Sequence, residues 1–207
     1  MKDIKNNSLC DIMKRFGSDK STFHNYTKIY TELFKSLIDD QINFFELGIG
    51  TTSSDFSCNM GPNGHPGASL RGWKEYFPKA NIYSADIDAR ILFEEDRIQT
   101  FYCDQTDPKS IKEMWGSSIL KDVNFDIMID DGWHQYLPNL TFFENSIHKL
   151  KRGGYYIIED LLPETWDLFD GNLENLENKY PDLEFMMIKI NPRNKYCGDN
   201  NLLIIKK

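Results

Sequence analysis

The sequence predicts an α/β domain: a Rossmann-like, doubly wound sheet of seven strands, mostly parallel, with a C-terminal antiparallel hairpin strand. Three observations support this fold class. Five short runs rich in Ile, Phe or Tyr alternate with stretches of helical length. These runs show little polar alternation, which is typical of strands buried on both faces of a sheet. Two final apolar runs are joined by about ten turn-rich residues, too few for a crossover helix, and are therefore expected to pair as a hairpin.

The first 40 residues are expected to be a helical leader. They offer a short helix over 9–16. Over 27–39, apolar side chains recur at positions 29, 30, 33, 34 and 37, which is one face of an amphipathic helix. The core is expected to begin at residue 41 and to run to residue 207, so that leader and core form a single domain.

The core elements follow in order along the chain. Strands are predicted at 42–48, 81–87, 97–104, 125–131 and 154–160, with helices between them at 68–77, 108–120 and 137–150. A helix at 163–180 leads to the hairpin strands at 183–190 and 201–207. Residues 51–67 fit neither pattern. Because loops of this length are usually functional, this stretch is interpreted as an ordered loop or lid.

Composition narrows the partners and the location. The formal charge is −8 and the pI is about 5.0, which argues against non-specific binding to nucleic acid. No apolar run approaches the roughly 20 residues of a membrane span, and the first residues lack the apolar segment of a signal peptide. The four cysteines form no CxxC pair, as expected of isolated thiols in a reducing compartment. A cytoplasmic protein with a small-molecule partner is therefore expected.

Acidic residues stand at the ends of successive strands, the edge at which open α/β sheets bind ligands. The first strand leads through Glu46 into Gly48 and Gly50, which permit a tight turn and the close approach of a ligand. No third glycine follows at the GxGxxG spacing and no GK[ST] is present, which disfavours dinucleotides and phosphate loops. Asp86 ends the second strand and can accept ribose hydroxyls, and Asp104 ends the third and can accept an adenine amino group. A single acid of this kind is usually just solvated, but the recurrence favours a site.

A denser acidic group follows the fourth and fifth strands. Asp131 and His134 lie in DDGWH, and Glu159 and Asp160 end the fifth strand. Three converging carboxylates repel one another unless they are protonated or bind a metal ion. Hard oxygen ligands favour Mg²⁺ or Ca²⁺, and His134 is placed to act as a base beside that ion. The alternative interpretation is a solvated acidic rim with a surface histidine.

The motifs ELGIG, SADID and YCDQ, together with the terminal hairpin, resemble class I S-adenosylmethionine (SAM)-dependent methyltransferases over nearly the whole chain. The resemblance implies a single methyltransferase domain over 1–207, with a catalytic core at 41–207. It implies that Glu46, Gly48 and Gly50 hold the methionine part of SAM. Asp86 would then bind the ribose and Asp104 the adenine.

DDGWH followed by GGYYIIED resembles the metal-dependent sugar O-methyltransferases of macrolide biosynthesis, of the mycinamicin and macrocin type. The resemblance implies that Asp131, Glu159 and Asp160 bind Mg²⁺ and that His134 is the catalytic base beside Asp131. Asp130, one residue earlier, is expected to face the cofactor.

The segment FGSDKSTFHNYTKIY, residues 16–30, resembles the leader of bacterial members. It implies that Lys20, His24 or Tyr26 folds over the cofactor. Those enzymes often carry further segments, so the acceptor and the oligomeric state do not follow from the resemblance, and a homo-oligomer stays open.

The predicted function is SAM-dependent O-methylation of a sugar, a nucleotide sugar or a glycan precursor, assisted by Mg²⁺. Three alternatives remain: methylation of an amine or a small polyhydroxylated metabolite, SAM binding without catalysis, and an NAD or nucleotide-sugar enzyme. Trp133 is expected to stack on a sugar face, and Arg71 and Arg193 to contact an anionic acceptor or simply solvent. The remaining tryptophans are expected to pack in the core or at its rim: Trp73, Trp115 and Trp166.

Overall fold

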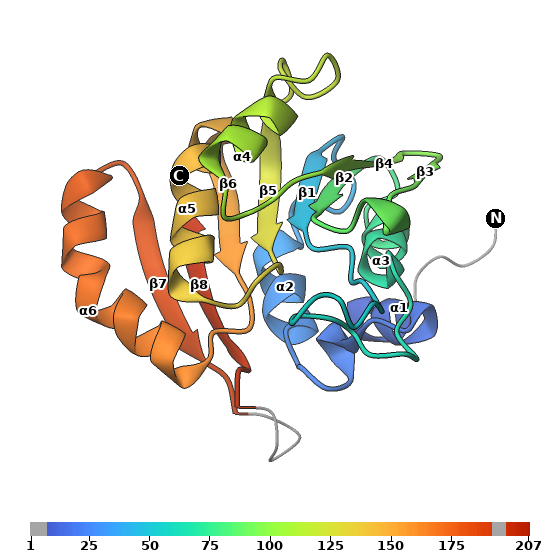
Figure 1. The fold of residues 1–207 in the computed structure, drawn as a ribbon, viewed down its shortest axis with the longest axis horizontal. Helices are drawn as coiled ribbons and strands as arrows, with labels where there is room; N and C mark the ends of the chain where they lie inside the picture. The colour runs from blue at the N-terminus through green and yellow to red at the C-terminus, as the bar shows by residue number, and fades with distance from the viewer. Residues whose placement is uncertain (1–7, 192–197) are drawn as a thin grey trace.

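The computed structural model describes residues 8–191 and 198–207, and its centre is one sheet (Figure 1). The strands are β1 (Asn43–Leu47), β2 (Asn81–Asp86), β3 (Glu94–Glu95), β4 (Ile98–Tyr102), β5 (Phe125–Asp130), β6 (Leu150–Ile158), β7 (Glu184–Lys189) and β8 (Asn201–Lys206). Their order across the sheet is β3-β4-β2-β1-β5-β6-β8-β7. All the described strands therefore belong to a single sheet.

The sheet is parallel in the middle and antiparallel at both edges. The neighbours β4, β2, β1, β5 and β6 are all parallel. At the C-terminus, β8 runs antiparallel to both β6 and β7, which confirms the predicted mostly parallel sheet with a terminal hairpin. The predicted count of seven strands is one too low, because β3 was missed. It is two residues long and pairs with β4 through a turn at Arg97, so it carries no apolar pattern.

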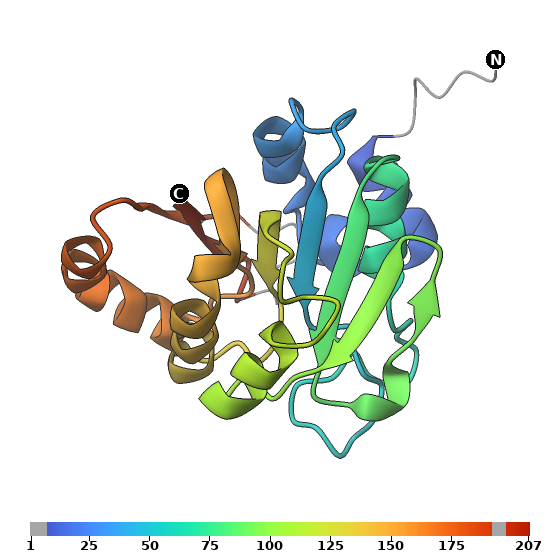
Figure 2. The ribbon, with the colours of Figure 1, turned by 90° about the horizontal axis from the view of Figure 1, so that it is seen from above.

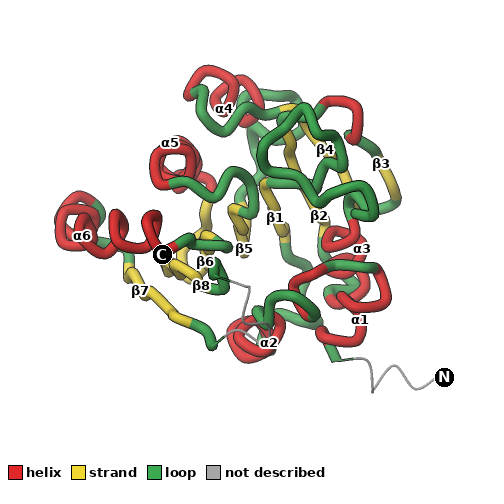
Figure 3. The backbone as a smooth tube through the Cα atoms, turned by 60° about the horizontal axis from the view of Figure 1, so that its bottom comes forward, coloured by secondary structure: helices red, strands yellow, loops and turns green. Residues whose placement is uncertain are grey.

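Helices cover both faces of the sheet, as Figures 2 and 3 show. They are α1 (Leu9–Phe16), α2 (Thr27–Phe34), α3 (Ala68–Tyr76), α4 (Pro108–Trp115), α5 (Tyr136–Ser146) and α6 (Pro163–Lys179). The leader helices α1 and α2 share one buried cluster with α3, whereas α4, α5 and α6 share the other. Two separate apolar layers on one sheet make the doubly wound arrangement that the sequence predicted.

The leader is held in the core by its own sequence. Helix α1 is capped at its N-terminus by Ser8, whose hydroxyl accepts the Asp11 N–H, and at its C-terminus by Gly17 in the left-handed conformation with φ 85°. In α2, Tyr30 and Phe34 are fully buried and contact Trp73 of α3. The leader is therefore a wall of the apolar layer, and the carboxyl ends of β5 and β6 point toward it (Figure 1).

Several smaller predictions can be checked on the described residues. The three tryptophans expected to pack, Trp73, Trp115 and Trp166, are buried. Within residues 8–191 and 198–207, no helix combines the length and the apolar character that crossing a membrane requires. Arg193 lies outside the described residues, so its expected contact cannot be followed.

Candidate active site

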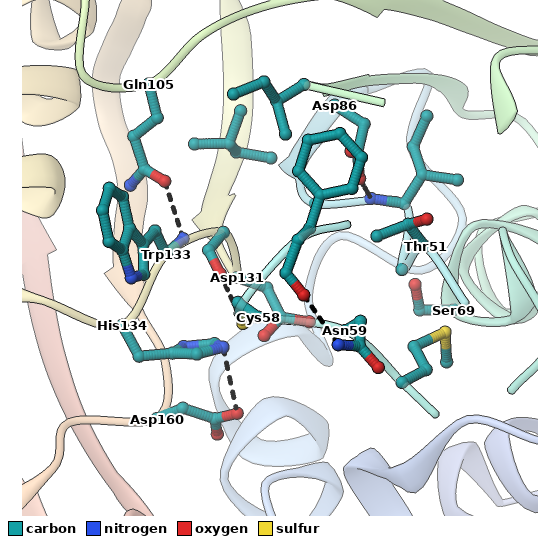
Figure 4. Close-up of a pocket in the computed structure, with 18 of the residues that line it drawn as sticks. Thr51, Cys58, Asn59, Ser69, Asp86, Gln105, Asp131, Trp133, His134 and Asp160 are labelled. Atoms are coloured by element: carbon teal, nitrogen blue, oxygen red, sulfur yellow. Dashed lines mark hydrogen bonds and ion pairs between the residues drawn. The ribbon is translucent and has the colours of Figure 1, made fainter. Parts of the chain in front are cut away.

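A cavity of about 620 Å³ opens over the carboxyl ends of the parallel strands. It is lined by the residues that follow β1, β2, β4 and β5, by Asp160 after β6, and by the loop at 51–60 and the leader (Figure 4). Parallel strands bring all their carboxyl ends to one edge, which is why acids far apart in sequence meet here. Gly48, Gly50, Asp86, Asp104 and Asp131 all line this one cavity.

The turn after β1 needs its glycines. Gly48 and Gly50 both have positive φ, at 95° and 87°. A Cβ on Gly48 would lie 2.1 Å from the backbone oxygen of Asp131, and one on Gly50 would lie 2.2 Å from the sulfur of Met60. The β1 turn is thus packed directly against the β5 turn and the loop, and its backbone is exposed to the cavity.

The acids after β2 and β4 are fixed by local hydrogen bonds. Asp86 accepts the N–H of Ile49 at 2.8 Å and that of Asp88 at 2.9 Å. Burial raises the pKa of Asp86, although these backbone donors oppose the shift. Asp104 accepts both the N–H and the hydroxyl of Thr106, at 2.9 and 2.7 Å. Both carboxylates keep a place in the cavity lining, where the resemblance put the ribose and the adenine.

Glu46 lies beneath the cavity floor rather than in its lining. It is fully buried within β1, where it accepts hydrogen bonds from Trp73 Nε1 at 2.5 Å and from the Ser69 hydroxyl. Burial raises its pKa, and Lys20, 3.9 Å away, opposes the shift. A direct contact of Glu46 with the methionine part of SAM stays a prediction.

Asp130 is also fully buried. It accepts Gln105 Nε2 at 2.9 Å and Asn139 Nδ2 at 3.1 Å, and burial raises its pKa to about 7. Gln105 in turn accepts the backbone N–H of Trp133 at 2.7 Å (Figure 4). Asp130 therefore fixes the loop that carries Trp133, and the expectation that it faces the cofactor stays untested. Sequence reasoning missed Gln105, although its place directly after Asp104 was a usable signal.

The acids after β5 and β6 gather around a histidine. Asp131, His134 and Asp160 each offer a ligand atom, and these atoms lie within 4.8 Å of one another. His134 Nε2 is 3.8 Å from an oxygen of Asp160 (Figure 4). Burial would lower the pKa of His134, but the neighbouring Cys58, Asp160 and Asp131 raise it well above its usual value. This group matches the donor chemistry of a divalent ion.

Glu159, the third predicted metal ligand, is not part of this group and is buried beside it. It is 1% exposed, and its two oxygens accept hydrogen bonds from the Tyr30 hydroxyl and the Lys20 ammonium. Burial raises its pKa, and Lys20 opposes the shift. The Lys20 ammonium also lies 2.6 Å from Asp131. The structure thus joins Asp131 and Glu159 through a lysine of the leader.

Asp160 is held by two further leader residues. Its oxygen accepts the Tyr26 hydroxyl, and His24 Nδ1 lies 3.5 Å from the same oxygen. The backbone of Asp160 has φ 54°, a left-handed conformation that is uncommon outside glycine. Lys20, His24 and Tyr26 therefore meet the acids after β6, whereas their predicted contact with the cofactor is untested.

The loop at 51–67 covers part of the cavity in an ordered path. Met60 N–H donates to Thr51 O and Gly67 N–H to Ile49 O, both at 2.8 Å. Trp133 lines the same cavity and is 40% exposed. Arg71 lies elsewhere, paired with Glu95 at 2.6 Å.

Comparison with solved structures supports the fold. No family model matches the chain. Against the MycE methyltransferase of the mycinamycin pathway, solved with Mg, SAH and mycinamycin VI, the TM-score is 0.74 at 22% identity, covering 98% of this chain and 54% of that one. An rRNA methylase from Streptococcus thermophilus gives a TM-score of 0.54 at 10% identity, covering 86% and 94%. The chain therefore has the α/β methyltransferase fold.

Sequence relatives narrow this further. A rhamnosyl tetracenomycin-C 2'-O-methyltransferase of Streptomyces olivaceus is 32% identical over 163 residues, which is 79% of this chain and 40% of that enzyme. Mycinamicin VI 2''-O-methyltransferase of Micromonospora griseorubida is 31% identical over 176 residues, 82% and 40%. The chain is thus a homologue of the macrolide and polyketide sugar O-methyltransferases, as the motifs indicated. It spans about 40% of the length of these relatives.

Proposed function

We propose that this chain is the catalytic domain of a SAM-dependent O-methyltransferase whose acceptor is a hydroxyl of a neutral sugar. The observation that carries the proposal is the single cavity over the sheet. The cavity joins a glycine turn with Asp86 and Asp104 to a group of Asp131, His134 and Asp160. The first half suits a methyl donor, and the second suits a sugar hydroxyl.

The first half fits SAM by shape and charge. Gly48 and Gly50 line the cavity without side chains of their own, so a cofactor can approach the backbone of this turn closely. Asp86 offers a carboxylate for the ribose hydroxyls, and Asp104 offers one for the adenine amino group. The positive sulfonium of SAM is favoured in an acidic site, whereas a negatively charged phosphate group would be repelled there.

The second half fits a divalent ion. Asp131 and Asp160 offer oxygen donors that face the cavity, next to His134. These two carboxylates would hold Mg²⁺, with Glu159 as the third ligand that the resemblance implies. A bound Mg²⁺ would supply Lewis acidity, which lowers the pKa of an acceptor hydroxyl.

The protein side chains would remove the proton, orient the acceptor and exclude water. His134 stands beside both aspartates at the cavity, where its neutral form is placed to take the proton of the acceptor hydroxyl. A bound divalent ion would favour that neutral form, because its charge offsets the aspartates that raise the pKa of His134. Trp133 would stack on the sugar and set its angle of approach, and the loop at 51–67 would exclude water. Methyl transfer from sulfur to oxygen then depends mainly on positioning.

The charge of the cavity favours a neutral acceptor over a nucleotide sugar. Seven aspartates line it: Asp19, Asp55, Asp86, Asp104, Asp131, Asp160 and Asp199. Among the described lining residues, Lys20 supplies the one Lys or Arg side chain, and it is already engaged by Asp131 and Glu159. A diphosphate would meet repulsion here, whereas the hydroxyls of a glycoside or glycan would find acceptors. The relatives are named for sugar positions on tetracenomycin and mycinamicin, in keeping with this class.

The proposal is tested by a SAM-consumption assay against neutral glycosides, amines and nucleotide sugars, with Mg²⁺ or with EDTA. We expect turnover with a neutral glycoside only, and loss of turnover in EDTA. Asp131→Ala should abolish turnover, whereas Asp170→Asn, an exposed acid on α6, should not change it. SAM binding by calorimetry without turnover on any acceptor would point to a binding module, and binding of NAD in place of SAM would overturn the assignment.

A further inference from the structure

We propose that Lys20 is a positioning residue that acts as a built-in counter-ion of the acid group and competes with the divalent ion for Asp131 and Glu159. This inference rests on the proposed function, because it concerns the metal ion of that site. Lys20 would keep the metal-free protein folded and at the same time weaken its affinity for the ion. The relevant part of the molecule is the short 3₁₀ helix Asp19–Ser21, which places the lysine in the cavity wall.

The contacts of Lys20 are those of a cation at the centre of several acids. The side chain is 2% exposed, and its ammonium lies 2.6 Å from Asp131 Oδ2 and 3.9 Å from Glu46 Oε1. It also donates to Glu159 Oε2. Asp131 and Glu159 are 111 and 139 residues away in sequence, so this one side chain ties the leader to the ends of both β5 and β6.

The charge balance makes Lys20 necessary in the metal-free state. Glu46 and Glu159 are almost completely buried, and their other described partners, such as Trp73 and Tyr30, are neutral donors. Among the described ion pairs, Lys20 is the one Lys or Arg that reaches these two carboxylates. Removing one member of a buried ion pair leaves an uncompensated charge, which is strongly destabilising.

The same contacts place Lys20 in competition with a metal ion for these carboxylates. Mg²⁺ binds carboxylate oxygens at about 2.0–2.1 Å and needs their lone pairs. The ammonium already donates to Asp131 Oδ2 and Glu159 Oε2. A metal ion bound to the same carboxylates would lie close to the ammonium, and the two cations would repel each other. An ion that takes these same oxygens must therefore displace the ammonium from at least one of them, and an ion that binds the other oxygen of Asp131 is still repelled by the ammonium beside it. Only Asp160 of the predicted ligands has no contact with Lys20 in the described pairs.

The first test uses Lys20→Met, which removes the charge and keeps much of the length, and Lys20→Arg, which keeps the charge. The probe is Mn²⁺, with its affinity measured by electron paramagnetic resonance and by calorimetry. We expect Lys20→Met to bind Mn²⁺ about tenfold more tightly than the wild type. Its thermal midpoint should be low without the ion and should rise more than that of the wild type when Mn²⁺ is added. Lys20→Arg should restore stability without the ion and return the affinity toward the wild-type value.

A second measurement uses the unmutated protein, so it does not depend on a variant that folds poorly. Lysine acetylation is followed by mass spectrometry with and without saturating Mg²⁺. We expect Mg²⁺ to speed labelling of Lys20 several-fold, because the ion releases it from Asp131. Lys149 is an internal control, since it is also buried but donates to the backbone oxygens of Leu120 and Lys121. Its labelling should not change.

The possible failures are distinguishable. If the wild type and Lys20→Met both bind no Mn²⁺, the metal site of the proposed function fails and this inference fails with it. If the wild type binds Mn²⁺ but Lys20→Met binds it equally or more weakly, only the competition is overturned. Unchanged or slower acetylation of Lys20 in Mg²⁺ would also overturn it, with the proposed methyl transfer left intact.

Discussion

The two halves of the cavity are built by different means. At the ends of β2 and β4, carboxylates are held mainly by the backbone of the strand-end turns, as in the bonds from Ile49 N–H and Asp88 N–H to Asp86 and from Thr106 N–H to Asp104. After β5 and β6, the carboxylates are held by leader side chains 111 to 139 residues away in sequence. The first half is therefore fixed by the backbone of the sheet's own turns, whereas the carboxylates of the second half depend on the docked leader for their partners. A substitution in one half of the cavity should therefore leave binding in the other half unchanged.

The largest expected effect is on chemistry in the second half. His134→Ala should lower kcat by roughly 10²–10⁴, the usual contribution of a general base. The affinity for SAM should be unchanged, because His134 stands at the opposite side of the cavity from Asp86 (Figure 4). Steady-state kinetics with calorimetry for SAM checks both parts. A matched loss of SAM affinity would show that the two halves are not separate.

The next largest effect is expected on SAM binding in the first half of the cavity. Asp86→Asn should weaken SAM binding by about 10- to 150-fold, because a charged acceptor of hydrogen bonds contributes about 1.5–3 kcal/mol. Calorimetry with SAM measures this, and the exposed Asp170→Asn is the control. The affinity of the same variant for Mn²⁺ should stay at the wild-type value. A large change in Mn²⁺ binding would contradict the division.

Stability should depend on the leader contacts more than on exposed groups. Tyr30→Phe removes the hydroxyl that donates to buried Glu159, and should lower the free energy of unfolding by about 1–3 kcal/mol. Tyr102→Phe, at a half-exposed position of β4, should change it by less than about 0.5 kcal/mol. Urea unfolding of both variants gives the comparison. Equal effects would mean that the leader contact adds nothing to the fold.

The smallest effect is a difference in reactivity between two cysteines of the cavity wall. Burial raises the pKa of the Cys103 thiol to about 12, so very little thiolate is present at pH 8. Iodoacetamide at that pH should therefore leave Cys103 unmodified in the folded protein and modify it after unfolding. Cys58, which is only partly buried, should react first and be protected by SAH. Peptide mass spectrometry resolves the two sites.

The sequence allowed prediction of most of the fold because periodic patterns are local. The central strands, the terminal hairpin and the acids at the strand ends all follow from runs of a few residues, whereas β3 escaped because two residues carry no pattern. The site was predictable to the same extent. The convergence of Asp131, His134 and Asp160 follows from parallel strands. The burial of Glu46 and the bond from Lys20 to Glu159 did not follow, because they depend on how the leader docks.

The φ torsion of Asp160 sets the different directions of the two adjacent acidic side chains after β6. With φ at 54°, Asp160 turns toward His134, while Glu159 stays in the apolar layer beside Tyr30. A left-handed residue with a side chain costs roughly 1–2 kcal/mol, and Asn and Asp tolerate it better than other such residues. An Asp160→Asn substitution would thus keep the left-handed backbone and remove the negative charge. In the proposed mechanism, this one substitution would therefore remove a charged metal ligand while the backbone after β6 keeps its course.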